Sequence, residues 1–429
     1  MTGKVVDVAI VGAGPAGLTA ATELRRRGVG SVCVLEREPV AGGIPRHADH
    51  AGFGLRDLHR SLSGPHYARC LLRRAEAVGV EVRTGVQATG WTADGALELT
   101  GSGGRTTLAA PAVVLATGCR ERPRSARLIP GTRPQGVMTT GTLQQLVYLE
   151  HEPVGGRALV VGAEHVSFSA VATLGEAGAR TVEIITEHPR HQSFAAFAIA
   201  AAVRYRAPLR TRSALSEIIG SPRVEAAAVT DLDTGARREI ACDVVVLTAD
   251  WIPDHELAVA AGAELDAGTR GPVVDARLRT SRPGLFAAGN LLHGAEPADV
   301  AALSGRTVAG SVLDYLSGAA WPAASVPVVC QSPLHWIVPN RIVPGEPARS
   351  FRLRAREILH DVRIEAIQDG RVLARRRLPR VMPGRSARLG AGWMDQVDPA
   401  GPVVEVRVGS ARFGTKRRAE RPKHQTGER

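Results

Sequence analysis

The chain has 429 residues, of which 44% are hydrophobic and 22% charged. It is too long for a single ordinary core and too apolar for disorder, so we expect two or three folded domains. The formal net charge of +12 lies almost wholly in the last fifth of the chain, where 21 Lys and Arg face 10 Asp and Glu from residue 341 onward. This distribution favours a solvated basic surface over a nucleic-acid-binding domain.

Five cysteines are widely spaced and form no CxxC pair. The pattern argues against a redox dithiol, a zinc site and an iron–sulfur cluster, so no metal is predicted. The longest apolar run, 194–203, is about half of a membrane span and predicts a buried helix. The run 5–11 leads directly into a glycine motif, which argues against a signal peptide. We therefore expect a cytoplasmic protein without a membrane span.

Along the chain, the first clear unit is an apolar run, a glycine turn, a helix-like stretch and a second apolar run at 32–35, which predicts a βαβ unit. The turn reads Gly12-Ala13-Gly14-Pro15-Ala16-Gly17. Gly12 permits the tight turn, Gly14 lets the backbone approach a pyrophosphate, and Gly17 allows close packing of helix on strand. The helix N-terminus then offers free N–H groups to the diphosphate, and Pro15 costs no hydrogen bond there.

An acidic residue, Glu36, ends the second strand of this unit. A carboxylate at this spacing hydrogen-bonds the diol of an adenosine ribose and repels a 2′-phosphate. Strand, glycine turn, helix and acidic residue together predict a dinucleotide site.

A second βαβ unit opens with the run 158–161 and continues to the run 182–185. Its turn keeps Gly162 but places Glu164 where the backbone should meet a pyrophosphate, and both the bulk and the charge of that side chain oppose phosphate. Glu187 is correctly spaced for a ribose. NAD(P) binding is thus possible but doubtful, and a purely structural role for this unit is the alternative.

The signature Gly284–Asn290 then returns the chain to the first unit. We predict an α/β protein in which a Rossmann-like dinucleotide-binding domain (1–125 and 280–320), the FAD domain by the resemblance given next, contains an inserted, second Rossmann-like domain of NAD(P) type (135–255). Short alternating segments after residue 322 predict a small β-rich C-terminal domain over 325–410. The basic segment 411–429 has few apolar residues and is expected to be disordered.

These motifs resemble the two-dinucleotide-domain flavoproteins related to glutathione and thioredoxin reductases, over about residues 5–320. The resemblance implies FAD and extends the cofactor site beyond the glycine turn and Glu36. The further residues are Arg37 beside the ribose contact, Gly43 after the Gly-Gly pair, Val86, Thr117 and Gly118 in the "ATG" strand end, and Gly289 and Asn290 in the second FAD motif. The family usually has Asp where Asn290 stands, and an amide can still donate and accept. Asp299 is expected as the N-cap of a helix that faces the flavin pyrimidine edge.

Within that superfamily, the segments 43–47 and 116–123 are most similar to flavoprotein subunits of opine oxidases and hydrogen cyanide synthase. That branch implies oxidation of a C–N bond in an amino acid or secondary amine, by hydride transfer to flavin N5. Disulfide reduction is excluded because neither family position holds a dithiol. Two alternatives stay open: an NAD(P)H-dependent FAD reductase, and a flavoprotein subunit that acts mainly in assembly or electron transfer. A partner subunit or a homo-oligomer is compatible with each.

The candidate catalytic residues lie in the segment after Gly43, which the resemblance places near the flavin. Arg46 could hold a substrate carboxylate, and His47 or His50 could take a proton from a substrate ammonium. The plainer interpretation is that these side chains only pack and hydrogen-bond in a loop.

Overall fold

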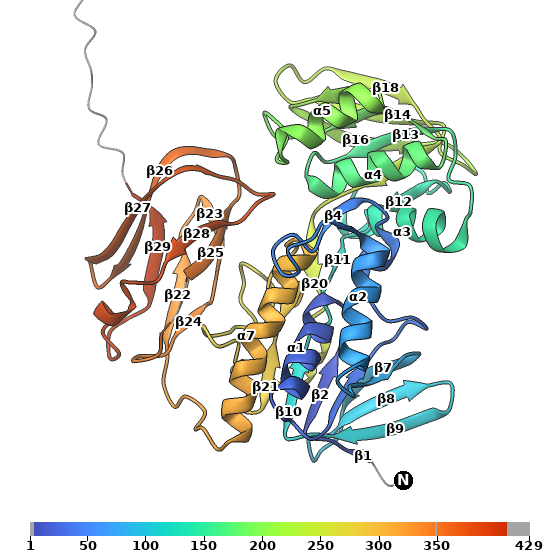
Figure 1. Ribbon diagram of the computed structural model, residues 1–429. Coiled ribbons are helices and arrows are strands. Elements are labelled where there is room, and N and C mark those ends of the chain that lie inside the picture. The colour runs from blue at the N-terminus through green and yellow to red at the C-terminus, as the bar shows by residue number, and fades with distance from the viewer. Residues whose placement is uncertain (1–3, 348–349, 410–429) are drawn as a thin grey trace, which may run out of the picture.

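The computed structural model describes residues 4–347 and 350–409, arranged as two parallel-sheet units and a separate β unit (Figure 1). The first sheet has five parallel strands in the order β21-β10-β2-β3-β6. They are β2 (Val8–Val11), β3 (Val32–Leu35), β6 (Glu81–Arg83), β10 (Ala112–Leu115) and β21 (Leu285–Ala287). The chain leaves this sheet after β10 and returns to it at β21, which confirms the predicted insertion.

Three helices cover the first sheet: α1 (Pro15–Arg26), α2 (Gly64–Glu76) and α7 (Ala298–Leu316). Helices α1 and α7 lie side by side (Figure 1). A Cβ at Gly305 would overlap the carbonyl oxygen of Ala16, so glycine permits this close approach. All residues of β2, β3 and β10 are buried, as expected for a parallel sheet with both faces covered.

The predicted strand 5–11 is divided in two by Asp7. The first piece, β1 (Lys4–Val5), pairs with β9 (Gly104–Ala109) in a sheet with β8 (Leu97–Gly101) and β7 (Val86–Trp91). The Asp7 carboxylate accepts a hydrogen bond from the backbone N–H of Ser31, and the Ser31 hydroxyl accepts one from the backbone N–H of Asp7. This reciprocal pair replaces strand pairing at the point where the chain changes sheets.

The second unit repeats the parallel pattern with the strand order β12-β19-β13-β14-β15. Its strands and helices are β12 (Val137–Thr139), α3 (Thr140–Gln145), the turn η3 (Leu146–Glu150), β13 (Arg157–Val161), α4 (His165–Glu176), β14 (Arg180–Ile185), α5 (Ala195–Arg204), β15 (Leu209–Arg210) and β19 (Val244–Leu247). An antiparallel sheet of β16 (Ser213–Ile219), β17 (Ala226–Asp231) and β18 (Arg237–Ala241) lies beside it. Two chain segments connect the units, one leaving the first unit and one returning to it. They pair with each other as β11 (Cys119–Glu121) and β20 (Trp251–Pro253), and α6 (Glu256–Ala260) follows β20.

The apolar run 194–203 forms helix α5, but the prediction that this helix is buried is wrong. Phe194, Ile199 and Val203 are 47%, 61% and 75% exposed, whereas Ala201 is buried. Helix α5 packs on α4 along one side. A sequence that is apolar all round therefore leaves much of its hydrophobic surface in solvent.

The C-terminal unit is β-rich, as its alternating segments predict. One sheet has the order β24-β22-β29-β26-β27 and the other β23-β25-β28. Their bounds are β22 (Val326–Cys330), β23 (Leu334–Val338), β24 (Arg341–Ile342), β25 (Ser350–Ala355), β26 (Leu359–Gln368), β27 (Arg371–Val381), β28 (Ala387–Gly390) and β29 (Val404–Val408). The unit has its own hydrophobic core, in which Phe351 stacks on Trp393. The predicted disordered tail, 411–429, lies outside the described residues.

Candidate active site

The first glycine turn leaves open space where a diphosphate is expected. A Cβ at Gly14 would meet nothing within 4 Å, while a Cβ at Gly12 or Gly17 would overlap a backbone carbonyl oxygen. Helix α1 starts at Pro15 directly after Gly14 and has no side-chain cap on its first turn. Its N-terminal N–H groups are therefore free of side-chain acceptors in the place where an anion would bind.

The Glu36 carboxylate lies at the same end of the sheet and is 8% exposed. It accepts hydrogen bonds from the backbone N–H groups of Ala13 and Glu38, both at 3.0 Å. The Val86 N–H donates to the Glu36 carbonyl oxygen. Arg37, in contrast, is 62% exposed and lies 3.8 Å from Asp254. The structure therefore brings Glu36 and Val86 together beside the glycine turn, with Arg37 at the surface.

Segments distant in the sequence converge on this turn. Gly43 has φ +63°, and its Cβ would stand 2.9 Å from the Cα of Gly14. Gly289 has φ +73°, and its Cβ would stand 2.8 Å from the Cβ of Ala16. The backbones of the predicted FAD motifs thus approach the diphosphate turn from two sides, at positions where only glycine fits.

Hydrogen bonds attach the "ATG" strand end to the segment after β20, which returns the chain from the second unit to the first. The Thr117 hydroxyl donates to the carbonyl oxygen of Asp254 at 2.7 Å, and the Asp254 N–H donates to the carbonyl oxygen of Gly118. A Cβ at Gly118 would meet nothing within 4 Å. The open side of Gly118, like that of Gly14, fits a cofactor lying along this edge of the sheet.

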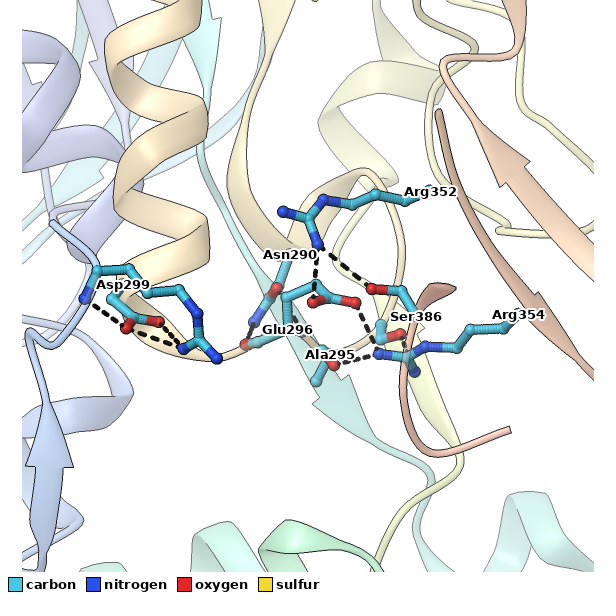
Figure 2. Close-up of polar contacts among 9 residues, drawn as sticks. Asn290, Ala295, Glu296, Asp299, Arg352, Arg354 and Ser386 are labelled. Atoms are coloured by element: carbon cyan, nitrogen blue, oxygen red, sulfur yellow. Dashed lines mark hydrogen bonds and ion pairs between the residues drawn. The ribbon is translucent and has the colours of Figure 1, made fainter. Parts of the chain in front are cut away.

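Asn290 organises the loop that leads into α7. Its side-chain amide donates to the carbonyl oxygen of Glu296 at 3.1 Å, and its side-chain oxygen accepts from the Glu296 N–H at 2.9 Å (Figure 2). The N-cap of α7 is Pro297, so the prediction that Asp299 is the N-cap is wrong. Asp299 lies in the first turn and is 2% exposed, and its carboxylate accepts from the backbone and guanidinium of Arg56. The backbone is extended at Pro297 (ψ 149°) and helical from Ala298, so the helix begins two residues earlier than expected.

Arginines from the C-terminal unit reach this loop, which the sequence did not indicate. Arg354 is 8% exposed and donates to the carbonyl oxygens of Gly294 and Ala295 and to the Glu296 carboxylate (Figure 2). Its guanidinium also lies over the ring of Trp336 at 5.2 Å. Two residues earlier on the same strand, Arg352 approaches the other carboxylate oxygen of Glu296 at 3.4 Å.

The three catalytic candidates of the η1 turn (Ile44–His47) and the residues after it have different surroundings. Arg46 pairs with Glu38 and donates to the carbonyl oxygen of Val40, so its guanidinium is already engaged. His47 is 1% exposed, and burial lowers its pKa. His50 is half-buried, and its Nδ1 lies 3.0 Å from the carbonyl oxygen of Ala51. These contacts disfavour Arg46 as a free carboxylate anchor and leave His50 as the more accessible histidine.

The second glycine turn is closed by its own side chains. Glu164 is the N-cap of α4, where its carboxylate accepts from the Ser167 N–H and its own N–H donates to the Ser167 hydroxyl in a capping box. The turn between β27 and β28 covers this corner: a Cβ at Gly384 would stand 3.3 Å from Glu164 and 2.8 Å from Gln192. In this structure the helix N-terminus that would bind the pyrophosphate of a second nucleotide holds a carboxylate instead.

No group of three or more His, Cys, Asp or Glu arranged for a metal occurs within residues 4–347 and 350–409. All five cysteines are unpaired, and burial raises the pKa of the Cys119 thiol near the "ATG" strand end. No helix of the described segments is long and apolar enough to cross a membrane.

Residues 6–305 match the model of the pyridine nucleotide-disulphide oxidoreductase family. The chain belongs to this family. Members of the family are FAD-dependent oxidoreductases, and the open first turn with Glu36 beside it fits that cofactor. The family's redox dithiol has no counterpart among the chain's cysteines.

Three relatives show how this flavoprotein compares with known members. It is 28% identical over 347 residues to one of the subunits of the opine oxidase of Agrobacterium tumefaciens (strain Ach5), covering 72% of the chain and 65% of that relative, which is less than two thirds of its length. It is 31% identical to a ferredoxin–NADP reductase of Salinispora tropica, covering 67% of the chain and 86% of the reductase. The crystal structure of T. acidophilum thioredoxin reductase superposes with a TM-score of 0.61 at 26% identity, covering 73% and 99% of the two chains.

We expect Glu164 to make the stability of the flavoprotein depend on pH, which can be measured. Burial raises the pKa of Glu164 from its ordinary 4.5 to about 7, so between these values the folded chain binds more protons here than the unfolded chain. Stability therefore falls as the pH rises through this window, and the loss is complete above about pH 7. We expect Glu164→Gln to raise the free energy of unfolding by about 1–3 kcal/mol at pH 8 and to change it little at pH 5.

Denaturant unfolding at the two pH values measures this difference, with exposed Glu76→Gln as the matched control. A gain of the same size at pH 5 and pH 8 would contradict the assignment to the ionisation of Glu164.

Proposed function

We propose that this flavoprotein oxidises the C–N bond of an amino acid or secondary amine. The observation that carries the proposal is the closed second turn, where Glu164 caps α4 and Gly384 packs over it. A nicotinamide nucleotide lacks its phosphate-binding turn there, so the substrate itself is the better source of electrons for the flavin. The similarity to the opine oxidase chain supports this substrate class. Because that relative is one of several subunits by name, the second part of the proposal is a partner chain.

FAD, when bound, supplies a hydride acceptor, and the chain must hold the substrate and accept its proton. Of the three candidates, we assign proton acceptance to His50 and a positioning role to His47. A carbonyl oxygen can only accept, so His50 Nδ1 carries the proton that meets Ala51 and Nε2 of the neutral ring is left as the base. His47, the last residue of η1, is 1% exposed, and burial lowers its pKa.

We expect His50→Ala to lower the rate of flavin reduction by a substrate amine by about 10²–10⁴-fold, the usual effect of a lost general base. His47→Ala should have a smaller effect on that rate and should lower thermal stability, because it leaves a cavity under η1. Stopped-flow absorbance under anaerobic conditions measures the rate for both variants. A normal rate of flavin reduction in His50→Ala, together with a large loss of that rate in His47→Ala, would assign the general base to His47 instead.

The function itself is tested by an anaerobic screen for bleaching of the purified FAD-loaded protein. We expect saturable bleaching by an amino acid or secondary amine, and slow or unsaturated bleaching by NADH and NADPH. Rapid, tight reduction by either nucleotide would overturn the proposal in favour of a reductase. The 31% identity to a ferredoxin–NADP reductase is the specific observation that makes this the second candidate.

A flavin that neither class of reductant bleaches would instead support the third candidate. That candidate is a flavoprotein subunit whose main role is assembly or electron transfer with a partner.

A further inference from the structure

The face of the three-stranded sheet β23-β25-β28 that meets the loop before α7 carries an excess of positive charge. Side chains alternate along β25, so Arg352 and Arg354 share a face while Phe351, Leu353 and Ala355 are buried in the core. Both arginines contact Glu296 (Figure 2). The strand pairing sets Arg352 directly opposite Arg388 on β28. Like charges directly opposite each other repel, so this pair of arginines costs the sheet some stability.

The single carboxylate of Glu296 does not satisfy both arginines equally. Arg354 takes one oxygen at 3.0 Å and two backbone carbonyls besides, and it is 8% exposed. Arg352 reaches the other oxygen at only 3.4 Å and the Ser386 hydroxyl at 3.3 Å, both through Nη1. Within the described residues no hydrogen bond engages its Nη2 or Nε. Arg354 uses both terminal nitrogens and has only its buried Nε unpaired, whereas Arg352 retains two unused nitrogens.

The position of Arg352 connects this unused charge to the flavin site. Glu296, its partner, is bound by Asn290 of the second FAD motif and lies two residues before α7. Arg352 is half-buried, with a side chain 24% exposed, so its remaining donors are partly desolvated but reachable. Arg46, the candidate from the sequence, is engaged by Glu38 and Val40. Arg46 Nε is also unpaired, but it is buried, whereas Arg352 has two unpaired nitrogens on a more exposed side chain and is the better carboxylate anchor.

We propose that Arg352 of the C-terminal β unit binds the carboxylate of the substrate, so that this unit completes the active site and selects carboxylate-bearing amines. The inference rests on the proposed amine oxidation. A guanidinium can bind a carboxylate through two parallel N–H donors, and the partial burial of Arg352 strengthens that bond. Glu296 remains held by Arg354 when Arg352 turns to the substrate, so the loop before α7 keeps its shape.

The test is a binding titration that needs no turnover. The probe is 2-methylalanine, which has no hydrogen on its α-carbon to leave as hydride, and the matched probe is tert-butylamine, in which a methyl group replaces the carboxylate. Succinate serves as an amine-free dicarboxylate. Perturbation of the visible flavin spectrum of the FAD-loaded protein reports binding. We expect Arg352→Gln to weaken the binding of 2-methylalanine and of succinate by about 10- to 100-fold and to leave the binding of tert-butylamine nearly unchanged.

Two further variants separate anchoring from a structural role. Arg352→Lys keeps the charge without the paired donors and should recover part of the lost affinity. Arg371→Gln removes an exposed arginine of the same unit and should bind all probes as the unmodified protein does. Equal weakening of the carboxylates and tert-butylamine by Arg352→Gln, or no weakening, would overturn the assignment, as would an unmodified flavoprotein that responds to neither carboxylate.

Failure of the proposed function has a different signature. In that case no amine bleaches the flavin, while the carboxylate probes still bind in an Arg352-dependent way.

Discussion

Gly14→Val is expected to yield a folded protein that contains almost no FAD. The unmodified chain should carry about one non-covalent FAD per molecule. A Cβ at position 14 meets nothing within 4 Å in the protein itself, so the turn should tolerate a small branched side chain there. That same space is where the diphosphate must approach the N-terminus of α1, and the valine methyl groups would occupy it. The variant thus separates cofactor binding from folding.

Visible absorbance and chromatography of the released cofactor measure the FAD content, and circular dichroism checks the fold. Gly17→Val is the contrasting control, because its Cβ would overlap the carbonyl oxygen of Gly12 and should destabilise the turn itself. A yellow Gly14→Val protein with stoichiometric FAD would contradict the site. Release of FMN in place of FAD from the unmodified protein would contradict the role of Glu36, which needs an adenosine ribose to bind.

The second large effect is expected from Arg354→Met, which should cost about 3–5 kcal/mol of stability, the typical penalty for breaking a buried ion pair. Arg354 and Glu296 are 8% and 7% exposed, and the two carbonyl oxygens that Arg354 binds would lose their donor as well. The C-terminal unit should then detach more easily from the loop before α7. Denaturant unfolding gives the energy, and limited proteolysis between the units reports the detachment.

A matched substitution is available in the same unit. Arg377 pairs with Asp361 at 2.6 Å, and the two side chains are 76% and 62% exposed, so Arg377→Met should change stability by about 0–1 kcal/mol. Similar losses in both variants would show that burial of the Arg354–Glu296 pair has no special weight.

The sequence could predict those parts of the site that are local. Gly12, Gly14 and Gly17 have their tasks within one turn, and the spacing to Glu36 is fixed by one helix and one strand. The same holds for Glu164, whose position in its turn already opposed phosphate. The capping box then explains how the helix N-terminus is satisfied without a ligand.

Contacts between distant segments could not be predicted in this way. Nothing near Arg352 indicates that β25 faces a loop more than fifty positions earlier, since that follows from how the C-terminal sheets pack. Helix α5 differs in the other direction: its apolar composition predicts burial, but much of its surface is exposed. Asp299 was misplaced for a smaller reason, the start of α7 after Pro297. The domain bounds and the cofactor residues stay predictions until binding and cleavage experiments test them.

The C-terminal unit contacts both parallel-sheet units at once. Arg354 donates hydrogen bonds to the loop before α7. Gly384 packs on Glu164, and Arg385 lies 4.6 Å over the ring of Phe194. The C-terminal unit therefore bridges the two units, which the paired strands β11 and β20 also connect. A catalytic cycle that swings the second unit away from the first would have to break all of these contacts in every turnover. We therefore expect electron transfer in this protein to proceed without movement of the second unit relative to the first. A covalent cross-link between the C-terminal unit and α4 should then leave turnover intact.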